Sequence, residues 1–165
     1  RPDINAVVHA HPTYATGFAA ARQPLMSRLL PEVIVVLGGI PLADYATPST
    51  PEVAESLSPF VMKHDAILLA NHGVVTYGKD LYDAYFKMEK TEHAAHITFV
   101  ARMLGGEHVL NEDDLRKLRA ASLQSYGKDI LGEHPVSDEY ETSSSHFLSD
   151  EEIRDIVRQM IQGKS

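Results

Sequence analysis

Two histidines stand two positions apart in the segment AVVHAHP, residues 6–12, at the end of a β-branched run. Successive side chains of a strand point to opposite faces, so His9 and His11 share one face, with Cα atoms roughly 6 to 7 Å apart. Two imidazoles on one face can bind the same metal ion. The alternative is that one of the two simply faces solvent. Pro12 stops the strand directly afterwards, which places the pair at its carboxyl end, where ligands usually bind in α/β folds.

A third histidine follows a different strand. Residues 66–70 (AILLA) are apolar throughout, as in a buried strand, and Asn71-His72-Gly73 comes next. Gly73 permits a tight turn or a close backbone approach, which can direct a loop histidine to a fixed point. Three neutral imidazoles with one open position form a catalytic zinc site. We therefore predict one Zn²⁺ per chain, bound by His9, His11 and His72; the alternative for His72 is a simple turn residue.

Three segments carry a resemblance to a known family: residues 5–20 (NAVVHAHPTYATGFAA), 38–43 (GGIPLA) and 67–90 (ILLANHGVVTYGKDLYDAYFKMEK). They resemble the class II aldolase/adducin family, and the resemblance covers roughly residues 1–127. It implies that His9, His11 and His72 are the family's three zinc-ligating histidines. It also implies an α/β fold, a three-layer α/β/α sandwich with a central mixed, largely antiparallel sheet. The family's homotetramer, with active sites near subunit boundaries, is expected as well.

The chain departs from the family pattern in two places. Family enzymes carry a phosphate-binding loop and a proton-moving acidic residue before the His-x-His strand, and neither has a counterpart here. We therefore expect residues 1–165 to be a single domain, with a core at 1–127 and a tail at 128–165, that lacks an N-terminal part. Glu32 stands where the fuculose-phosphate aldolases of the family present a tyrosine to the neighbouring subunit. Strict fuculose-phosphate specificity is therefore not expected.

The chemistry implied by the resemblance is Lewis-acid catalysis on a sugar phosphate. The metal would stabilise the enediolate formed in retro-aldol cleavage of a phosphorylated ketose, such as a fuculose- or rhamnulose-type sugar phosphate. One such centre can also serve a sugar-phosphate 4-epimerase or a dehydratase. A third alternative is a non-catalytic, adducin-like interaction domain, against which the intact histidine set argues. The general base is expected in the absent N-terminal part.

Composition narrows the class of protein. A chain of 165 residues with 44% hydrophobic content is about one domain long and can bury a core. The absence of cysteine fits the reducing cytoplasm. A net charge of −8 argues against nucleic acid and anionic membranes as partners, and no apolar stretch approaches the ~20 residues of a membrane span. We expect a cytoplasmic protein whose partners are a small-molecule sugar phosphate and further copies of itself.

The sequence predicts elements that alternate in an α/β order, with capping residues and glycines at their ends. We expect strands at 33–37, 66–70 and 74–77. The first expected helices cover residues 13–21 and run from the capping box Ser49-Thr50-Pro51-Glu52 to about Lys63. A long helix is expected from 78–80 to the glycines at 105–106, another at about 112–125 with Asn111 as its N-cap, and a short one after Ser149.

Other histidines and one tyrosine were considered for the site. Glu89 with His93, and Glu92 with His96, are i, i+4 pairs that could form a second metal site, but such pairs are more often plain charge or hydrogen-bond partners. The remaining histidines lie in polar surroundings and are expected to face solvent: His64, His108, His134 and His146.

Tyr126 is the candidate catalytic side chain. Tyr126-Gly127 resembles the Tyr-Gly that follows the corresponding helix in fuculose-phosphate aldolases, where that tyrosine reaches the active site. The polar segment 128–147 after it has few apolar residues, so we expect a mobile cover over the metal site. A tyrosine that only packs at the helix end is the alternative.

Overall fold

The computed structural model describes residues 1–26 and 28–127. The predicted last helix, the tail cover, His134 and His146 therefore lie outside the described residues. The described elements follow the order β1 (Ala6–Ala10), α1 (Thr13–Ala20), α2 (Pro31–Leu37), β2 (Leu42–Ala43), α3 (Glu52–Leu57), β3 (Ala66–Leu69), β4 (Gly73–Gly78), α4 (Leu81–Met103) and α5 (Glu112–Tyr126).

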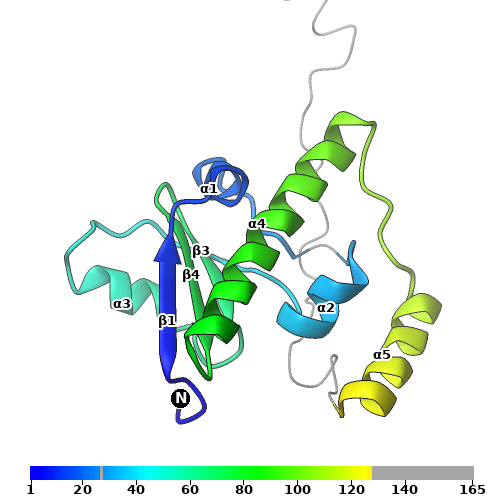
Figure 1. Cartoon of the computed structure of the whole chain (residues 1–165). Helices are drawn as coiled ribbons and strands as arrows, with labels where there is room; N and C mark the ends of the chain where they lie inside the picture. Colours follow the sequence, from blue (N-terminus) through cyan, green and yellow to red (C-terminus); the bar gives the residue numbers. More distant parts are fainter. Residues whose placement is uncertain (27, 128–165) are drawn as a thin grey trace, which may run out of the picture.

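The strands form one mixed sheet in the order β1-β4-β3-β2 (Figure 1). β4 runs antiparallel to both β1 and β3, whereas β2 is parallel to β3. His9 lies opposite Val75 and Ala10 opposite Val74, so the carboxyl end of β1 meets the start of β4. The turn between β3 and β4 contains His72, and the register therefore brings this turn beside the end of the His-x-His strand.

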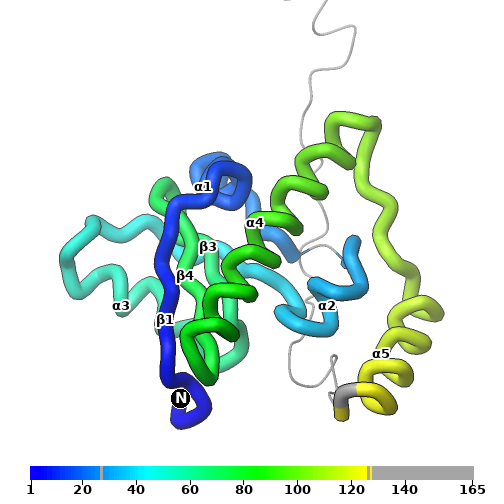
Figure 2. Tube along the Cα trace, in the orientation of Figure 1, coloured from blue at the N-terminus to red at the C-terminus, as the bar shows by residue number. Residues whose placement is uncertain are grey.

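The sheet has a helical layer on each face. Ala66, Leu68 and Val74 pack with α1, α2 and α4 on one face. The alternate residues Ile67, Leu69, Val75 and Tyr77 pack on the other face against hydrophobic side chains of α3 and the segment after it: Leu57, Phe60 and Val61. The tube in Figure 2 shows α3 on the side of the sheet away from α2 and α5. This confirms the α/β sandwich with a mixed, largely antiparallel sheet.

The predicted strand at 33–37 is wrong, because these residues form helix α2. Pro31 occupies the first turn, where its missing N–H costs nothing, and Glu32 adds a favourable charge near the helix N-terminus. Val33, Ile34 and Leu37 are buried on one side of the helix. A short apolar run fits a strand and a buried helix equally well, so tertiary packing decided between them.

The predicted capping box at residues 49–52 is also wrong. Ser49 has a left-handed backbone, with φ of 65°, and the Thr50 hydroxyl donates to the Thr47 carbonyl instead of capping. Helix α3 ends at Leu57, short of the expected Lys63. The predicted strands at 66–70 and 74–77 are confirmed to within a few residues, as are the helices predicted at 13–21, from 78–80 to 105–106, and at about 112–125.

The first half of α4 is held to the sheet by a buried lysine. The Lys87 ammonium donates to Asp65 Oδ2 at 2.8 Å, to the Tyr77 carbonyl at 3.0 Å and to Asp83 Oδ2 at 3.1 Å. Arg1 pairs with the other Asp65 oxygen at 2.7 Å. Burial acts to raise the pKa of Asp65, but hydrogen bonding and charge from Lys87 and Arg1 outweigh it and lower that pKa.

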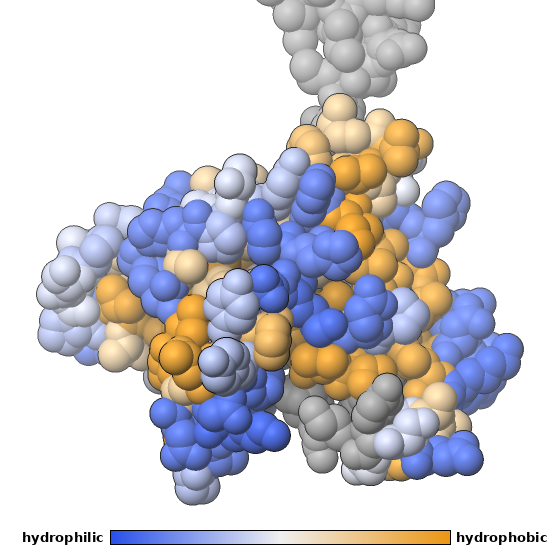
Figure 3. Space-filling view, in the orientation of Figure 1, coloured by the Kyte–Doolittle hydropathy of each residue, from blue (hydrophilic) through white to orange (hydrophobic). Residues whose placement is uncertain are grey.

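Exposed hydrophobic side chains gather on α4 and just after it, where Figure 3 shows an orange area beside the blue polar surface. A surface of this character is typical of an interaction site. The exposed residues there are Leu81, Tyr82, Tyr85, Phe86, Phe99, Val100, Met103, Leu104 and Val109. Among the described residues, no helix is both long and apolar enough to cross a membrane.

Candidate metal centre

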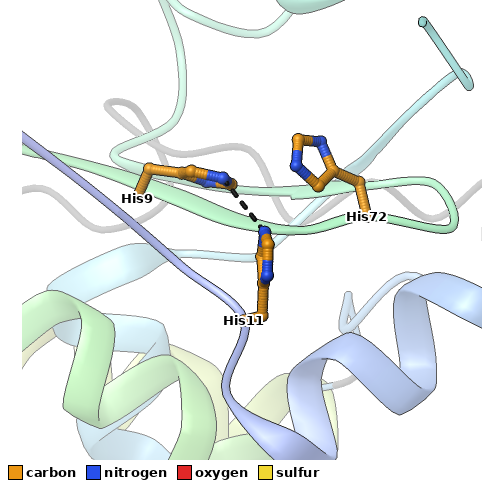
Figure 4. Close-up of side chains that lie close together, drawn as sticks. All are labelled: His9, His11 and His72. Carbon is orange, nitrogen blue, oxygen red and sulfur yellow. Dashed lines mark hydrogen bonds between the residues drawn. The ribbon is translucent and has the colours of Figure 1, made fainter. Parts of the chain in front are cut away.

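The three predicted histidines meet at one point. One possible ligand atom from each of His9, His11 and His72 lies within 4.8 Å of the others. The ring centroids are 4.8 to 5.0 Å apart, and the three side chains converge in Figure 4. In the described part of the chain this is the one group of three or more His, Asp or Glu side chains close enough to hold a metal ion.

Hydrogen bonds define the protonation of His9. Its Nδ1 lies 2.8 Å from the Val74 carbonyl oxygen. A carbonyl can only accept, so Nδ1 carries the proton and Nε2 of a neutral ring presents its lone pair to the cluster. Metal-bound histidines usually have this second hydrogen bond, which fixes the tautomer and the ring orientation.

The spacing of the nitrogens also fits a metal ion. His9 Nε2 and His11 Nε2 are 3.2 Å apart. Two nitrogens bound tetrahedrally at about 2.05 Å from one zinc ion would be ~3.3 Å apart. Without metal this short contact requires one ring to donate a proton to the other, and a metal ion would take the place of that proton. The donor set and its spacing therefore fit zinc.

Gly73 makes room for His11. A Cβ atom added at position 73 would lie 2.5 Å from His11 Cδ2 and 2.6 Å from the Ala10 carbonyl oxygen. The backbone of Gly73 is not left-handed, so the need for glycine is steric. The absence of a side chain lets β4 begin directly against the end of β1 and keeps the two parts of the cluster together.

The environment of His72 favours its neutral form. Burial lowers the pKa of His72 below its usual 6.5, and the neighbouring His9 and His11 lower it further. A metal binds the neutral imidazole, so this shift reduces proton competition near neutral pH. His9 and His11 are exposed and His72 is half-buried, which leaves one side of the cluster open to a substrate.

Glu92, considered above for a second metal, has a different role. Its two oxygens accept from the backbone N–H groups of Tyr14 and Ala15, at 2.9 and 2.8 Å. These are free donors at the start of α1, which has no capping side chain of its own. His96 stacks on the Tyr14 ring, with centroids 3.9 Å apart. Glu92 thereby fixes the chain immediately after His11, a function that its sequence position alone does not reveal.

The structure also places the other candidate residues. His64 is buried, with Nδ1 3.2 Å from the Gly39 carbonyl oxygen, so the expectation that it faces solvent is wrong; the chain folds over it although its sequence neighbours are polar. His108 is exposed as expected. Glu32 is exposed in the first turn of α2. Tyr126 is the last residue of α5, but its side chain lies outside the described part.

The chain is similar to several known proteins. The family model of the class II aldolase and adducin N-terminal domain matches residues 1–99. The chain is 39% identical over 105 residues to an L-fuculose phosphate aldolase of Methanococcus maripaludis, covering 64% of this chain and 56% of that protein. It is 32% identical over 123 residues to a 3-oxo-tetronate 4-phosphate decarboxylase of Pectobacterium atrosepticum, covering 71% and 55%. The chain thus spans about half the length of the curated relatives it matches.

Solved structures share the arrangement of the elements. An L-fuculose 1-phosphate aldolase superposes with a TM-score of 0.65 at 33% identity, over 73% of this chain and 57% of that one. An L-fuculose-1-phosphate aldolase from Thermus thermophilus superposes with a TM-score of 0.57 at 29% identity, over 62% and 55%. The fold expected from the sequence is therefore the fold of these proteins.

Proposed function

The chain belongs to the class II aldolase and adducin family, and we propose that it forms the metal-binding part of a zinc-dependent aldehyde-lyase that cleaves a phosphorylated ketose. The observation that carries the proposal is the convergence of His9, His11 and His72, with a 3.2 Å nitrogen spacing between the first two. A non-catalytic, adducin-like interaction domain would not require imidazole nitrogens at this spacing.

Each part of the site has a defined task in this proposal. A zinc ion held by the three histidines would act as a Lewis acid and stabilise negative charge on a substrate oxygen while a carbon–carbon bond breaks. The Val74 carbonyl holds His9 in the tautomer that offers Nε2 to the ion. The open side of the cluster admits the carbonyl and hydroxyl oxygens of a sugar.

A decarboxylase is the second candidate. The similarity to the 3-oxo-tetronate 4-phosphate decarboxylase of Pectobacterium atrosepticum covers 71% of this chain at 32% identity, against 64% at 39% identity for the aldolase of Methanococcus maripaludis. Loss of carbon dioxide from a 3-oxo acid also develops negative charge on the 3-oxo oxygen, so the same electrostatic stabilisation would serve both reactions. The epimerase and dehydratase alternatives depend on the same stabilisation of negative charge on a substrate oxygen.

Three further expectations belong to this proposal. Tyr126 is proposed to donate its hydroxyl proton to a leaving or attacking oxygen. The exposed hydrophobic surface of α4 is proposed to be buried in a homo-oligomer, in line with the tetramer that the resemblance implies. A cytoplasmic location is likewise proposed, on the absence of cysteine from the chain.

The decisive activity test uses the natural protein that contains this chain. The purified protein is stripped with a chelator, reloaded with Zn²⁺ and given a panel of ketose 1-phosphates and 3-oxo-tetronate 4-phosphates. Zinc-restored release of an aldehyde and a three-carbon phosphate supports the lyase. Zinc-restored release of carbon dioxide instead identifies the decarboxylase, and equal turnover with and without zinc refutes the metal-dependent proposal.

A further inference from the structure

Two residues with left-handed backbones face each other beside the metal cluster. Arg22 has φ of 57° and Asn71 has φ of 56°. Apart from Ser49, they are the described residues other than glycine with a positive φ. The left-handed region costs an ordinary side chain free energy, and such outliers concentrate at functional sites.

The backbones around these residues are joined. Helix α1 ends with Gln23 N–H bonded to the Phe18 carbonyl at 2.9 Å and Arg22 N–H to the Ala19 carbonyl at 3.3 Å. This is the helix-ending motif in which glycine usually takes the left-handed place. The same Ala19 carbonyl accepts from Asn71 N–H at 3.2 Å. The end of α1 is thereby docked onto the turn between β3 and β4.

The side chains reinforce this junction. Arg22 Nε donates to Asn71 Oδ1 at 2.9 Å. Asn71 is the third residue of a turn closed by His72 N–H to the Leu69 carbonyl at 3.0 Å, a position that requires a positive φ in type II turns. The turn conformation fixes the direction in which His72, the next residue, leaves the backbone.

Stability alone does not account for Arg22. Glycine would adopt the same backbone without a steric cost, and Arg22 and Asn71 are both exposed, where a hydrogen bond contributes little to folding. What glycine would lack is the guanidinium group that reaches Asn71. The strained residue therefore provides a contact to the turn rather than a better helix end.

We propose that Arg22 and Asn71 are positioning residues that hold His72 against His9 and His11. Glu92 fixes the start of α1, directly after His11. The Arg22–Asn71 bond fixes its end at the turn that contains His72. Helix α1 is thus a brace between the two parts of the histidine cluster. The inference rests on the proposed metal site, but it concerns residues that do not touch the metal.

Arg22→Gly tests the brace. Zn²⁺ affinity is measured by competition with a chromophoric chelator, and the thermal midpoint of the metal-free protein is measured alongside. We expect the zinc Kd to rise about 3- to 10-fold, the effect of one lost hydrogen bond, while the midpoint stays the same or increases. Loss of a merely structural residue would lower the zinc affinity and the thermal midpoint together. Arg116→Ala on α5, which also removes a positive charge, should leave the zinc Kd unchanged.

Asn71→Gly provides an independent test, because it keeps the left-handed turn and removes only the acceptor. It should raise the zinc Kd as much as Arg22→Gly does, and the double variant should bind zinc no more weakly than either single variant. The absorption spectrum of the Co²⁺-loaded variants should change with the placement of His72.

The outcomes separate the two proposals. If the unaltered protein binds no zinc, the proposed function fails. If it binds zinc and Arg22→Gly binds equally well, or if the two substitutions add fully, the brace is refuted while the metal site stands.

Discussion

Gly73→Ala is the substitution whose effect follows most directly from the structure. The new methyl group would lie 2.5 Å from His11 Cδ2 and 2.6 Å from the Ala10 carbonyl oxygen. The second atom belongs to the backbone of β1, so a side-chain rotation cannot relieve the contact. β1 and β4 must therefore separate by about 0.5 to 1 Å, and overpacking of this kind costs about 1 to 3 kcal/mol.

The same shift should weaken metal binding. Metal–ligand distances tolerate only about ±0.2 Å, so a displacement of His11 by about 0.5 Å or more removes it from the coordination range. We expect the zinc Kd of Gly73→Ala to increase at least about tenfold, the range seen when the support of a metal ligand is lost. Denaturant unfolding in the presence of chelator measures the stability, and chelator competition measures the Kd.

Gly17→Ala is the matched control. Gly17 lies inside α1, and an added Cβ meets no atom within 4 Å. Alanine in a helix interior should stabilise the protein by about 0.5 to 1 kcal/mol and leave the zinc Kd unchanged. If Gly73→Ala unfolds at the same denaturant concentration as the unaltered protein and binds zinc equally well, the close approach of β4 to His11 is not what forms the site.

Three further predictions concern the surroundings of the site. Glu92→Ala should destabilise the protein by about 1 to 2 kcal/mol in denaturant unfolding, because α1 loses its cap, whereas exposed Glu89→Ala should change stability little. Asp65 has a lowered pKa, so its contribution to stability should be complete above its unfolded pKa of about 4 and be lost as pH falls through the lower folded value; Asp65→Asn should flatten this acid limb of the unfolding free energy. Tyr126→Phe should reduce turnover of the natural protein without changing its zinc content or stability, and a large loss of stability would instead identify Tyr126 as a packing residue.

The sequence was sufficient to predict the candidate ligands where the local pattern and the chemistry of the side chains agree. The alternation along β1 placed His9 and His11 on one face, and the buried run before Asn71 placed His72 at a strand end. Their meeting point depends on β1 pairing with β4, a contact between distant segments that no local pattern specifies. Metal binding by the cluster stays a prediction.

Other features could not be obtained from the sequence. Residues 33–36 are β-branched but fold as part of a helix, which buries Val33, Ile34 and Leu37, and a short apolar run does not distinguish a buried strand from a buried helix. Glu92 caps α1 from a distant helix, and the Arg22–Asn71 bond joins the end of α1 to a distant turn. Neither contact between distant segments is specified by a local pattern. The one sequence signal that could have indicated the Arg22–Asn71 bond is Asn71 between an apolar strand and His-Gly, since asparagine tolerates the left-handed conformation.

Metal stoichiometry tests the central claim most directly. The purified protein is loaded with Zn²⁺, desalted and analysed for zinc per chain, beside His72→Ala and, as a control, His108→Ala, which removes an exposed histidine outside the cluster. We predict about one zinc per chain for the unaltered protein and for His108→Ala, and a clear loss for His72→Ala. Full zinc content in His72→Ala would contradict the three-histidine site.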